Sequence, residues 1–202
     1  EAKLAAADHE RIESRKQEMS LKDALMDWLG RTPIDELFPD FPEAFLSAYA
    51  RYADEQAAYQ DANPNLAPSQ KTAAHRQCER AKDEARNYLL GGDDAANRAH
   101  QAFVFIASYR REPLLRWPNA LIDAVIEFEQ NFRSFRFRHA RLVERMIGAR
   151  TGSGGSAGVA YLDATSRKYK IFGQLLEARS FLLSPDRLPP NPHPQRHAGR
   201  FS

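Results

Sequence analysis

The sequence predicts an all-α protein with a single domain, and three observations support this. Apolar residues recur at every third or fourth position along most of the chain, which is the spacing of helices with one apolar face. Clusters of proline, glycine and asparagine separate these stretches, as is typical of turns between helices. The one apolar run that could form a strand, "FVFIASY" at residues 103–109, lies inside a helical pattern.

The first half of the chain contains three predicted helices. The first covers residues 8–29 and ends at Gly30 and Pro33, because glycine and proline both terminate helices. The second covers residues 42–60. The third follows the break "NPNLAP", covers residues 69–90 and carries a mostly charged, solvated surface.

The second half of the chain begins with the turn "GGDD", in which Asp93 or Asp94 is the predicted N-cap of the next helix. We expect three helices here, over residues 95–113, 117–150 and 161–183. The remaining tail, residues 184–202, is rich in proline, and we expect it to be extended or mobile.

Composition excludes several classes of protein. The 202 residues carry a net charge of +2, from 29 basic and 27 acidic residues, which is too balanced to indicate a nucleic-acid partner. Cys78 is the one cysteine, so there is no internal disulfide framework, and a reducing compartment is expected. No apolar run approaches the ~20 residues that a membrane span needs. Because the sequence begins at Glu1 instead of Met, we expect a processed chain or the C-terminal fragment of a longer one.

The longest predicted helix carries one continuous apolar stripe with a histidine in it. The stripe consists of Leu121, Val125, Phe128, Phe132, Phe135, His139, Leu142 and Met146. A histidine in such a series is either a core residue bonded to a carbonyl or a metal ligand, and a neutral imidazole in an apolar cavity suits haem iron. The neighbouring arginines, which are Arg136, Arg138, Arg141 and Arg145, suit the propionates of a haem or simply form a solvated face. Residue chemistry leaves both interpretations open.

A glycine-rich stretch, "TGSGGSAG" at residues 151–158, follows this helix. Glycines allow a backbone to approach a ligand closely. The stretch is no phosphate-binding P-loop, since it lacks the Gly-Lys-Ser/Thr ending, and its loose match to a dinucleotide pattern has no preceding strand. A flexible connection is the alternative interpretation.

Taken together, "FRFRHARLVERMIGARTGSGGSAGVAYL" resembles the signature of the tryptophan 2,3-dioxygenase family. That signature runs Trp-Arg-(Tyr/Phe)-(Arg/Asn)-His, then Val-x-Arg-(Met/Ile)-(Ile/Leu)-Gly, then Gly-Thr-Gly-Gly-Ser-Ser-Gly. The resemblance is strong over residues 98–194, where "ASYRREP" and "RKYKIF" also match. It is weaker near the start, at "LKDALMDWLGRTP".

The resemblance implies a helical bundle of this family's type, with haem b (iron protoporphyrin IX) bound at the long helix. His139 matches the proximal iron ligand, and Gly155 and Ser156 match residues that contact the cofactor. Ser153, with Gly152 and Gly154, matches the segment that binds the substrate. Members cleave the indole C2–C3 bond of L-tryptophan with O₂, giving N-formylkynurenine at the start of the kynurenine pathway. They are cytoplasmic homotetramers.

Three departures from the family pattern matter. The family's tryptophan four residues before the proximal histidine is Phe135 here, and its threonine is Ser153. The family's N-terminal segments, which carry the distal histidine and the arginine that binds the substrate carboxylate, are absent. No catalytic residue is therefore identified within this chain, and a separate N-terminal segment is a possible partner. Without a distal wall, we expect the apolar face around Phe132, Phe135, His139 and Leu142 to stand partly open to water.

The resulting hypothesis is a haem-dependent dioxygenase of the tryptophan 2,3-dioxygenase type. Two alternatives stay open, namely a related haem enzyme that monooxygenates a tryptophan or tyrosine derivative, and a non-catalytic module that binds haem or indole. We expect variable helices over residues 1–97, haem- and substrate-binding helices with their loop over 98–183, and a tail over 184–202.

Two smaller groups of residues are predicted to be ordinary surface. His75 and Cys78 have the spacing of a metal-ligand pair, but no second pair accompanies them. Asp123, Glu127 and Glu129 are predicted to form an acidic face in contact with solvent.

Overall fold

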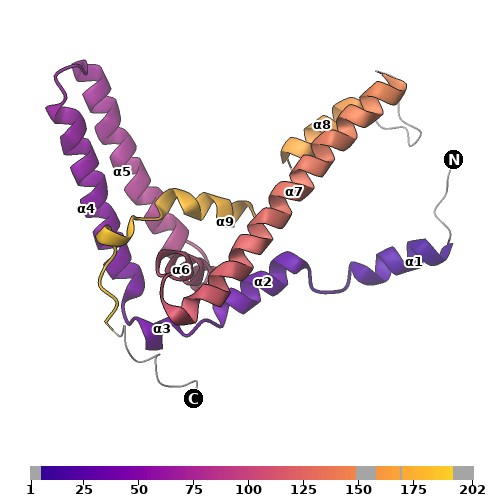
Figure 1. Cartoon of the computed structure of the whole chain (residues 1–202), viewed down its shortest axis with the longest axis horizontal. Coiled ribbons are helices and arrows are strands. Elements are labelled where there is room, and N and C mark those ends of the chain that lie inside the picture. Colours follow the sequence, from indigo (N-terminus) through magenta and orange to yellow (C-terminus); the bar gives the residue numbers. More distant parts are fainter. Residues whose placement is uncertain (1–5, 149–157, 169, 193–202) are drawn as a thin grey trace. The chain divides into compact units, whose positions relative to one another are not determined.

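The computed structural model describes residues 6–148, 158–168 and 170–192, and within these ranges it is helical without any strand (Figure 1). The all-α prediction is confirmed. The helices are α1 (Ala6–Arg15), α2 (Leu21–Gly30), α3 (Ile34–Leu37), α4 (Phe41–Ala62), α5 (Pro68–Leu90), α6 (Asp94–Ser108), α7 (Arg116–Ile147), α8 (Val159–Lys168) and α9 (Gly173–Ala178). Short 3-10 turns lie at Pro113–Leu115, Arg179–Phe181 and Pro185–Arg187.

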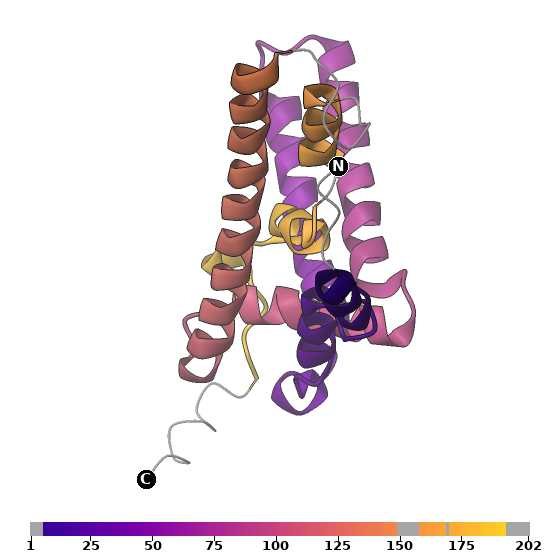
Figure 2. The same cartoon turned by 90° about the vertical axis from the view of Figure 1, so that its right-hand side faces the viewer.

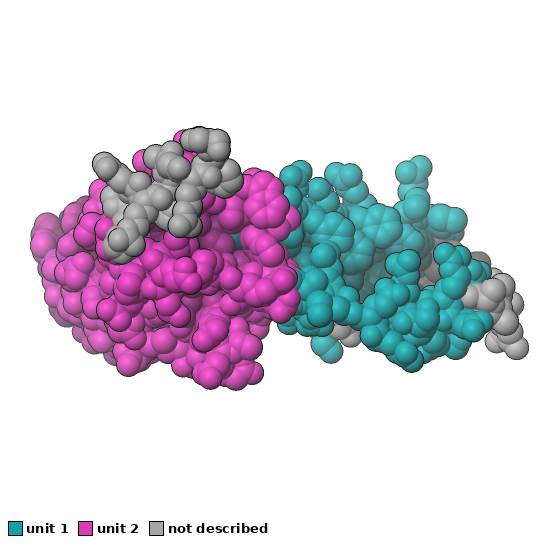
Figure 3. Space-filling model, turned by 90° about the horizontal axis from the view of Figure 1, so that it is seen from below, with its two compact units in different colours: residues 1–24, 122–173 teal, residues 25–121, 174–202 magenta. Residues whose placement is uncertain are grey.

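The chain divides into two compact units (Figure 3). Unit 1 consists of residues 1–24 and 122–173, and unit 2 consists of residues 25–121 and 174–202. The unit boundary falls within α7, so the helix begins in unit 2 and continues through unit 1. No helix among the described residues is long and apolar enough to cross a membrane.

Unit 2 is organised around α6, which is buried on almost every side. Phe103, Val104, Phe105 and Ile106 are at most 1% exposed, and a helix that is apolar all round is expected to lie in a core. α4 and α5 run antiparallel beside each other and both contact α6 (Figure 2). The ring of Phe41 lies 5.2 Å from that of Phe105 and 5.6 Å from that of Phe45, so aromatic contacts join α4 to α6.

Side-chain caps explain where two of the helices begin. Asp93 accepts a hydrogen bond from the Ala96 N–H at 2.8 Å, which confirms the predicted cap of α6. Ser20 accepts one from the Asp23 N–H at 3.1 Å and donates to the Asp23 carboxylate at 2.7 Å. The single helix predicted over residues 8–29 is therefore wrong: Ser20 starts a new helix, and α1 and α2 are separate.

The helix predicted over residues 161–183 is also interrupted. α8 ends at Lys168 and α9 begins at Gly173. The backbone N–H groups of Ile171 and Phe172 donate to the Glu129 side chain of α7 instead of continuing a helical ladder. A hydrogen bond from a distant element has overridden the local periodicity.

The described part of the tail belongs to unit 2 and contacts other residues of that unit. The Tyr109 hydroxyl donates to the Pro189 carbonyl at 2.7 Å, and burial raises the pKa of Tyr109. Arg187 pairs with Glu55 of α4 and lies over the ring of Tyr52, 5.1 Å from its centroid. Residues 184–192 are held in place by these contacts and are extended only outside the 3-10 turn at Pro185–Arg187. Residues 193–202 lie outside the described ranges.

Candidate functional site

Within unit 1, α7 carries two different stripes of side chains. The predicted apolar stripe is largely exposed: Phe128, Phe135, Leu142 and Met146 are 46%, 60%, 53% and 73% exposed. The buried positions are Ile122, Ile126, Glu129 and Ala140. Each of these follows a member of the predicted stripe by one residue, which is a rotation of about 100° around the helix. The buried side of α7 is therefore offset from the predicted stripe, and the stripe itself is open to solvent, as expected for its apolar face around His139.

The exposed stripe forms a column of nearly parallel rings, which we call the aromatic column and define as Phe128, Phe132, Phe135 and His139. Successive ring centroids lie 5.9, 6.4 and 5.8 Å apart. The planes of successive rings differ by 8°, 15° and 16°. The column follows from the i, i+4, i+7, i+11 spacing, which places these side chains one above another on the helix.

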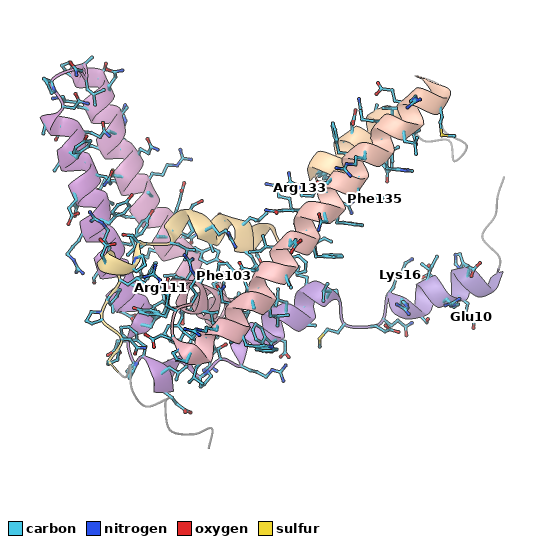
Figure 4. All side chains as sticks on the ribbon, viewed as in Figure 1. Glu10, Lys16, Phe103, Arg111, Arg133 and Phe135 are labelled. Carbon is cyan, nitrogen blue, oxygen red and sulfur yellow. The ribbon has the colours of Figure 1, made fainter. Side chains whose placement is uncertain are left out.

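His139 closes the column and is exposed. The alternative in which it is a buried core histidine is therefore wrong. Its imidazole stacks on Phe135, which is labelled on α7 in Figure 4. An exposed imidazole at the end of a row of stacked apolar rings is accessible to a ligand that approaches this face.

The four arginines around His139 differ in their surroundings. Arg136 lies over the Phe132 ring, 4.4 Å from its centroid, and so borders the aromatic column. Arg138 and Arg145 are exposed. Arg141 turns toward α8, where its guanidinium donates to the Asp163 carboxylate, and it also pairs with Glu144 at 2.7 Å. The hydrogen bond to Asp163 raises the pKa of Arg141.

Glu129 is the one acidic residue of α7 whose predicted position is wrong. It is 1% exposed, whereas Asp123 and Glu127 are exposed as expected. Its Oε2 accepts hydrogen bonds from the Ile171 and Phe172 N–H groups at 2.9 and 3.1 Å. Buried carboxylates require such partners. The sequence did contain a signal for this burial: Glu129 follows Phe128 by one residue, and the buried positions of α7 all lie one residue beyond the predicted stripe.

The glycine-rich segment falls outside the described residues, and this includes the predicted substrate and cofactor contacts Gly152, Ser153, Gly154, Gly155 and Ser156. Its two flanks are described. Gly148, at the end of α7, and Gly158, before α8, have φ angles of 61° and 55°. This left-handed conformation favours glycine, so both flanks have a conformational reason for their residue type.

No group of three or more histidine, cysteine or acidic side chains that could hold a metal ion occurs within residues 6–148, 158–168 and 170–192. His75 pairs with Asp61 at 2.5 Å at the end of the α4–α5 hairpin, and Cys78 lines an apolar groove between these helices. A haem needs only one protein ligand, so this absence has no bearing on whether His139 holds one.

Comparison with known proteins identifies the family. The model of the tryptophan 2,3-dioxygenase family matches residues 1–182. The chain belongs to the tryptophan 2,3-dioxygenase family. This match includes residues 1–97, where the sequence resemblance was weaker.

Individual relatives agree with the family match. A tryptophan 2,3-dioxygenase of Sorangium cellulosum is 40% identical, over 86% of this chain and 45% of its own length. Tryptophan 2,3-dioxygenase 2 of Ralstonia nicotianae is 37% identical, over 89% of this chain and 53% of its own length. A tryptophan 2,3-dioxygenase-like protein of Xanthomonas campestris pv. campestris is 42% identical, over 86% and 69%. The chain thus spans about half the length of the first two relatives.

Proposed function

We propose that this chain supplies the proximal wall and the substrate segment of a haem-dependent dioxygenase that acts on L-tryptophan. O₂ is inserted across the indole C2–C3 bond, and the product is N-formylkynurenine. The observation that carries the proposal is the exposed aromatic column ending at His139, in a member of the tryptophan 2,3-dioxygenase family.

The residues present fit a b-type haem. A porphyrin is a flat apolar ring with two carboxylates at one edge, and it needs an apolar wall, an axial ligand and cationic partners. The exposed rings of Phe128 and Phe135 offer apolar surface, and His139 offers the imidazole. Arg136 and Arg138 offer charge beside it.

Bound haem would supply the oxygen chemistry. The chain's own residues would hold the haem, orient the substrate and exclude water. His139 would hold the haem iron through its imidazole. The rings of the aromatic column would offer the haem apolar contacts and exclude water beside it. The Ser153 hydroxyl can donate to the substrate carboxylate and accept from its ammonium group, so it orients the amino-acid end of tryptophan.

The proposal includes a second wall. Phe128, Phe135, Leu142 and Met146 together expose a large apolar surface, and such surfaces mark binding sites. We assign the opposite wall to residues beyond those described here, either in the same protein or in a separate N-terminal segment. Assembly as a cytoplasmic homotetramer, which the family resemblance implies, belongs to the same proposal.

The test is the spectrum of the reduced haem complex. His139→Ala should abolish the five-coordinate ferrous spectrum, because the axial imidazole is lost, whereas His75→Ala should leave it unchanged. His75 is a matched control, since it is also an exposed histidine on a helix. A His139→Ala protein with the wild-type spectrum would overturn the assignment, and a haem-loaded wild type that forms no N-formylkynurenine from L-tryptophan would overturn the activity.

A further inference from the structure

An open groove with a volume of about 520 Å³ runs between α4 and α5, the two helices that lie side by side in Figure 1. Its lining consists of two tyrosines, four alanines, one leucine, one cysteine and four glutamines, all on these helices or in the loop that joins them. Pockets that bind small molecules typically measure about 300–1,000 Å³ and are lined by apolar and aromatic side chains with a few polar groups. The groove has the size and the composition of such a pocket.

The α4–α5 hairpin carries its interhelical ion pairs away from this groove. Lys82 of α5 donates to the Asp54 carboxylate of α4 at 2.5 Å, and His75 of α5 pairs with Asp61 of α4 at 2.5 Å. The two positions on each helix are seven residues apart, so both pairs lie on one face of the hairpin. Among the described residues that line the groove, in contrast, there is no aspartate, glutamate, lysine, arginine or histidine. A charged ligand would lose its hydration there without gaining an opposite charge, so the groove favours an uncharged one.

The groove also contains polar groups that no described residue satisfies. Tyr49 is 7% exposed, and its hydroxyl forms no hydrogen bond within the described ranges. Burial raises the pKa of Tyr49, so the hydroxyl stays protonated and remains a donor at neutral pH. The side-chain amides of Gln56, Gln60 and Gln77 likewise bond to none of the described residues. Buried polar groups usually have a partner, so the Tyr49 hydroxyl indicates that a ligand completes this groove.

We propose that the groove binds a small uncharged molecule with a flat aromatic body and an amide or hydroxyl group. The Tyr49 and Tyr52 rings, whose centroids lie 6.3 Å apart, offer aromatic contacts, and the small alanine side chains leave room for the body. The glutamine amides and the Tyr49 hydroxyl offer hydrogen bonds to the polar group. A folded partner fits less well, because specific interfaces use roughly 20–30 residues a side and twelve line the groove. The proposal does not depend on dioxygenase activity.

Alkylation of Cys78 measures whether the groove is occupied. This thiol lines the groove and is partly exposed, so N-ethylmaleimide, which is uncharged, should reach it in the folded full-length protein. The probe is 4-hydroxybenzamide, and the control ligand is 4-hydroxybenzoate, which has the same outline and a negative charge. We expect a Kd of about 1 mM for the amide, typical of a ligand of about ten non-hydrogen atoms, so about 10 mM should slow alkylation roughly tenfold. The carboxylate should change the rate less than about twofold, because its charge has no partner there. Mass spectrometry of the peptide that carries Cys78 gives the rate.

Three variants sharpen the test, each compared with itself in the presence and absence of ligand. Ala73→Lys adds a positive charge to the groove and should reverse the preference, so that 4-hydroxybenzoate protects Cys78 better than the amide does. Ala73 is exposed, so the longer side chain causes no overpacking. Ala58→Lys, at an exposed alanine of α4 outside the groove, is the matched control and should leave both results unchanged. Tyr49→Phe removes the unbonded hydroxyl and should weaken binding of the amide about twofold to tenfold.

Protection of Cys78 by 4-hydroxybenzamide and not by 4-hydroxybenzoate, with the preference reversed in Ala73→Lys alone, would support the proposal. Equal protection by the two ligands, or none by the amide, would overturn it. A Cys78 that resists N-ethylmaleimide in the folded protein without ligand would also overturn it, because another part of the protein or a partner chain would then cover the groove. Turnover of L-tryptophan does not enter this measurement, so the proposed function can fail without affecting the result.

Discussion

α6 and α7 both carry aromatic residues and a histidine stacked on another ring, but these side chains are buried on α6 and exposed on α7. On α6, His100 is buried, its ring lies 4.2 Å from that of Tyr88, and its Nδ1 is bonded to the Tyr88 carbonyl at 2.9 Å. On α7, His139 is exposed and stacks on an exposed phenylalanine. A core histidine is present in this chain, but it is His100. An apolar stripe in a sequence therefore predicts an apolar helix face, but it does not show what covers that face.

The sharpest way to break this comparison is to remove one phenylalanine from each helix. Phe103→Ala on α6 should lower the free energy of unfolding by about 3–5 kcal/mol, because the side chain is 1% exposed and leaves a cavity. Phe135→Ala on α7 should change it by less than about 0.5 kcal/mol, because that ring is 60% exposed. Both residues are labelled in Figure 4. Urea denaturation of the haem-free protein measures both, and equal losses would mean that the aromatic column is covered.

Within α7, Glu129 and Glu127 provide a second contrast. Glu129→Ala leaves the N–H groups of Ile171 and Phe172 without their acceptor, at roughly 1–3 kcal/mol for each group that stays buried. Most of this loss of stability should come from the Phe172 N–H group, because Phe172 is 3% exposed. Glu127→Ala, on the solvent face, should be close to neutral. Denaturant midpoints compare the two, and a neutral Glu129→Ala would show that water replaces the carboxylate.

The two histidines give the next smaller effect. His100→Ala removes the hydrogen bond to the Tyr88 carbonyl and the stacked ring, so we expect a loss of about 1–3 kcal/mol. His139→Ala should leave the stability of the haem-free protein almost unchanged. Thermal unfolding of the two variants tests this. A larger loss of stability in His139→Ala than in His100→Ala would mean that His139 is a core residue.

The smallest expected effect concerns two glycines at helix ends. An added Cβ at Gly148 or Gly30 would meet no atom within 4 Å, so neither substitution causes a clash. Gly148 has a φ of +61°, and Gly148→Ala should cost about 1–2 kcal/mol in backbone strain. Gly30→Ala, without that constraint, should stabilise by about 0.4–1 kcal/mol. Opposite signs in thermal unfolding would confirm that α7 ends in a left-handed turn.

Much of the fold could be predicted from the sequence, because helical periodicity and turn residues are local signals. The bounds of α4 and α5 follow from them, and the cap of α6 at Asp93 was predicted from residue type alone, although α6 ends at Ser108 instead of the predicted Pro113. The predictions fail where a side chain overrides the pattern. Ser20 caps a second helix within the first predicted helix, and a hydrogen bond to Glu129 accompanies the interruption of the last predicted helix.

The candidate site could be predicted only as far as the residues that share a face. The spacing of Phe128, Phe132, Phe135 and His139 identified the aromatic column, and their stacking confirms that the residues lie together. The exposure of the face around Phe135 and His139 was expected, because no distal wall was found in the sequence. Which other side of α7 is buried could not be predicted, because that depends on the elements that pack against it. The pairing of Arg141 with Asp163 was also out of reach, since the two lie 22 positions apart on different helices.

The contact between Trp28 and Trp117 determines what fluorescence can reveal about this protein. Their rings meet edge to face with centroids 5.9 Å apart, and the sequence contains no other tryptophan. Both belong to unit 2, so the tryptophan emission of the whole chain comes from one place where α2 and the start of α7 meet. Melting of unit 1, with its aromatic column, would leave that emission unchanged unless the two units unfold together. Comparing tryptophan emission with far-ultraviolet circular dichroism during unfolding would therefore reveal whether the chain behaves as one cooperative body or as two.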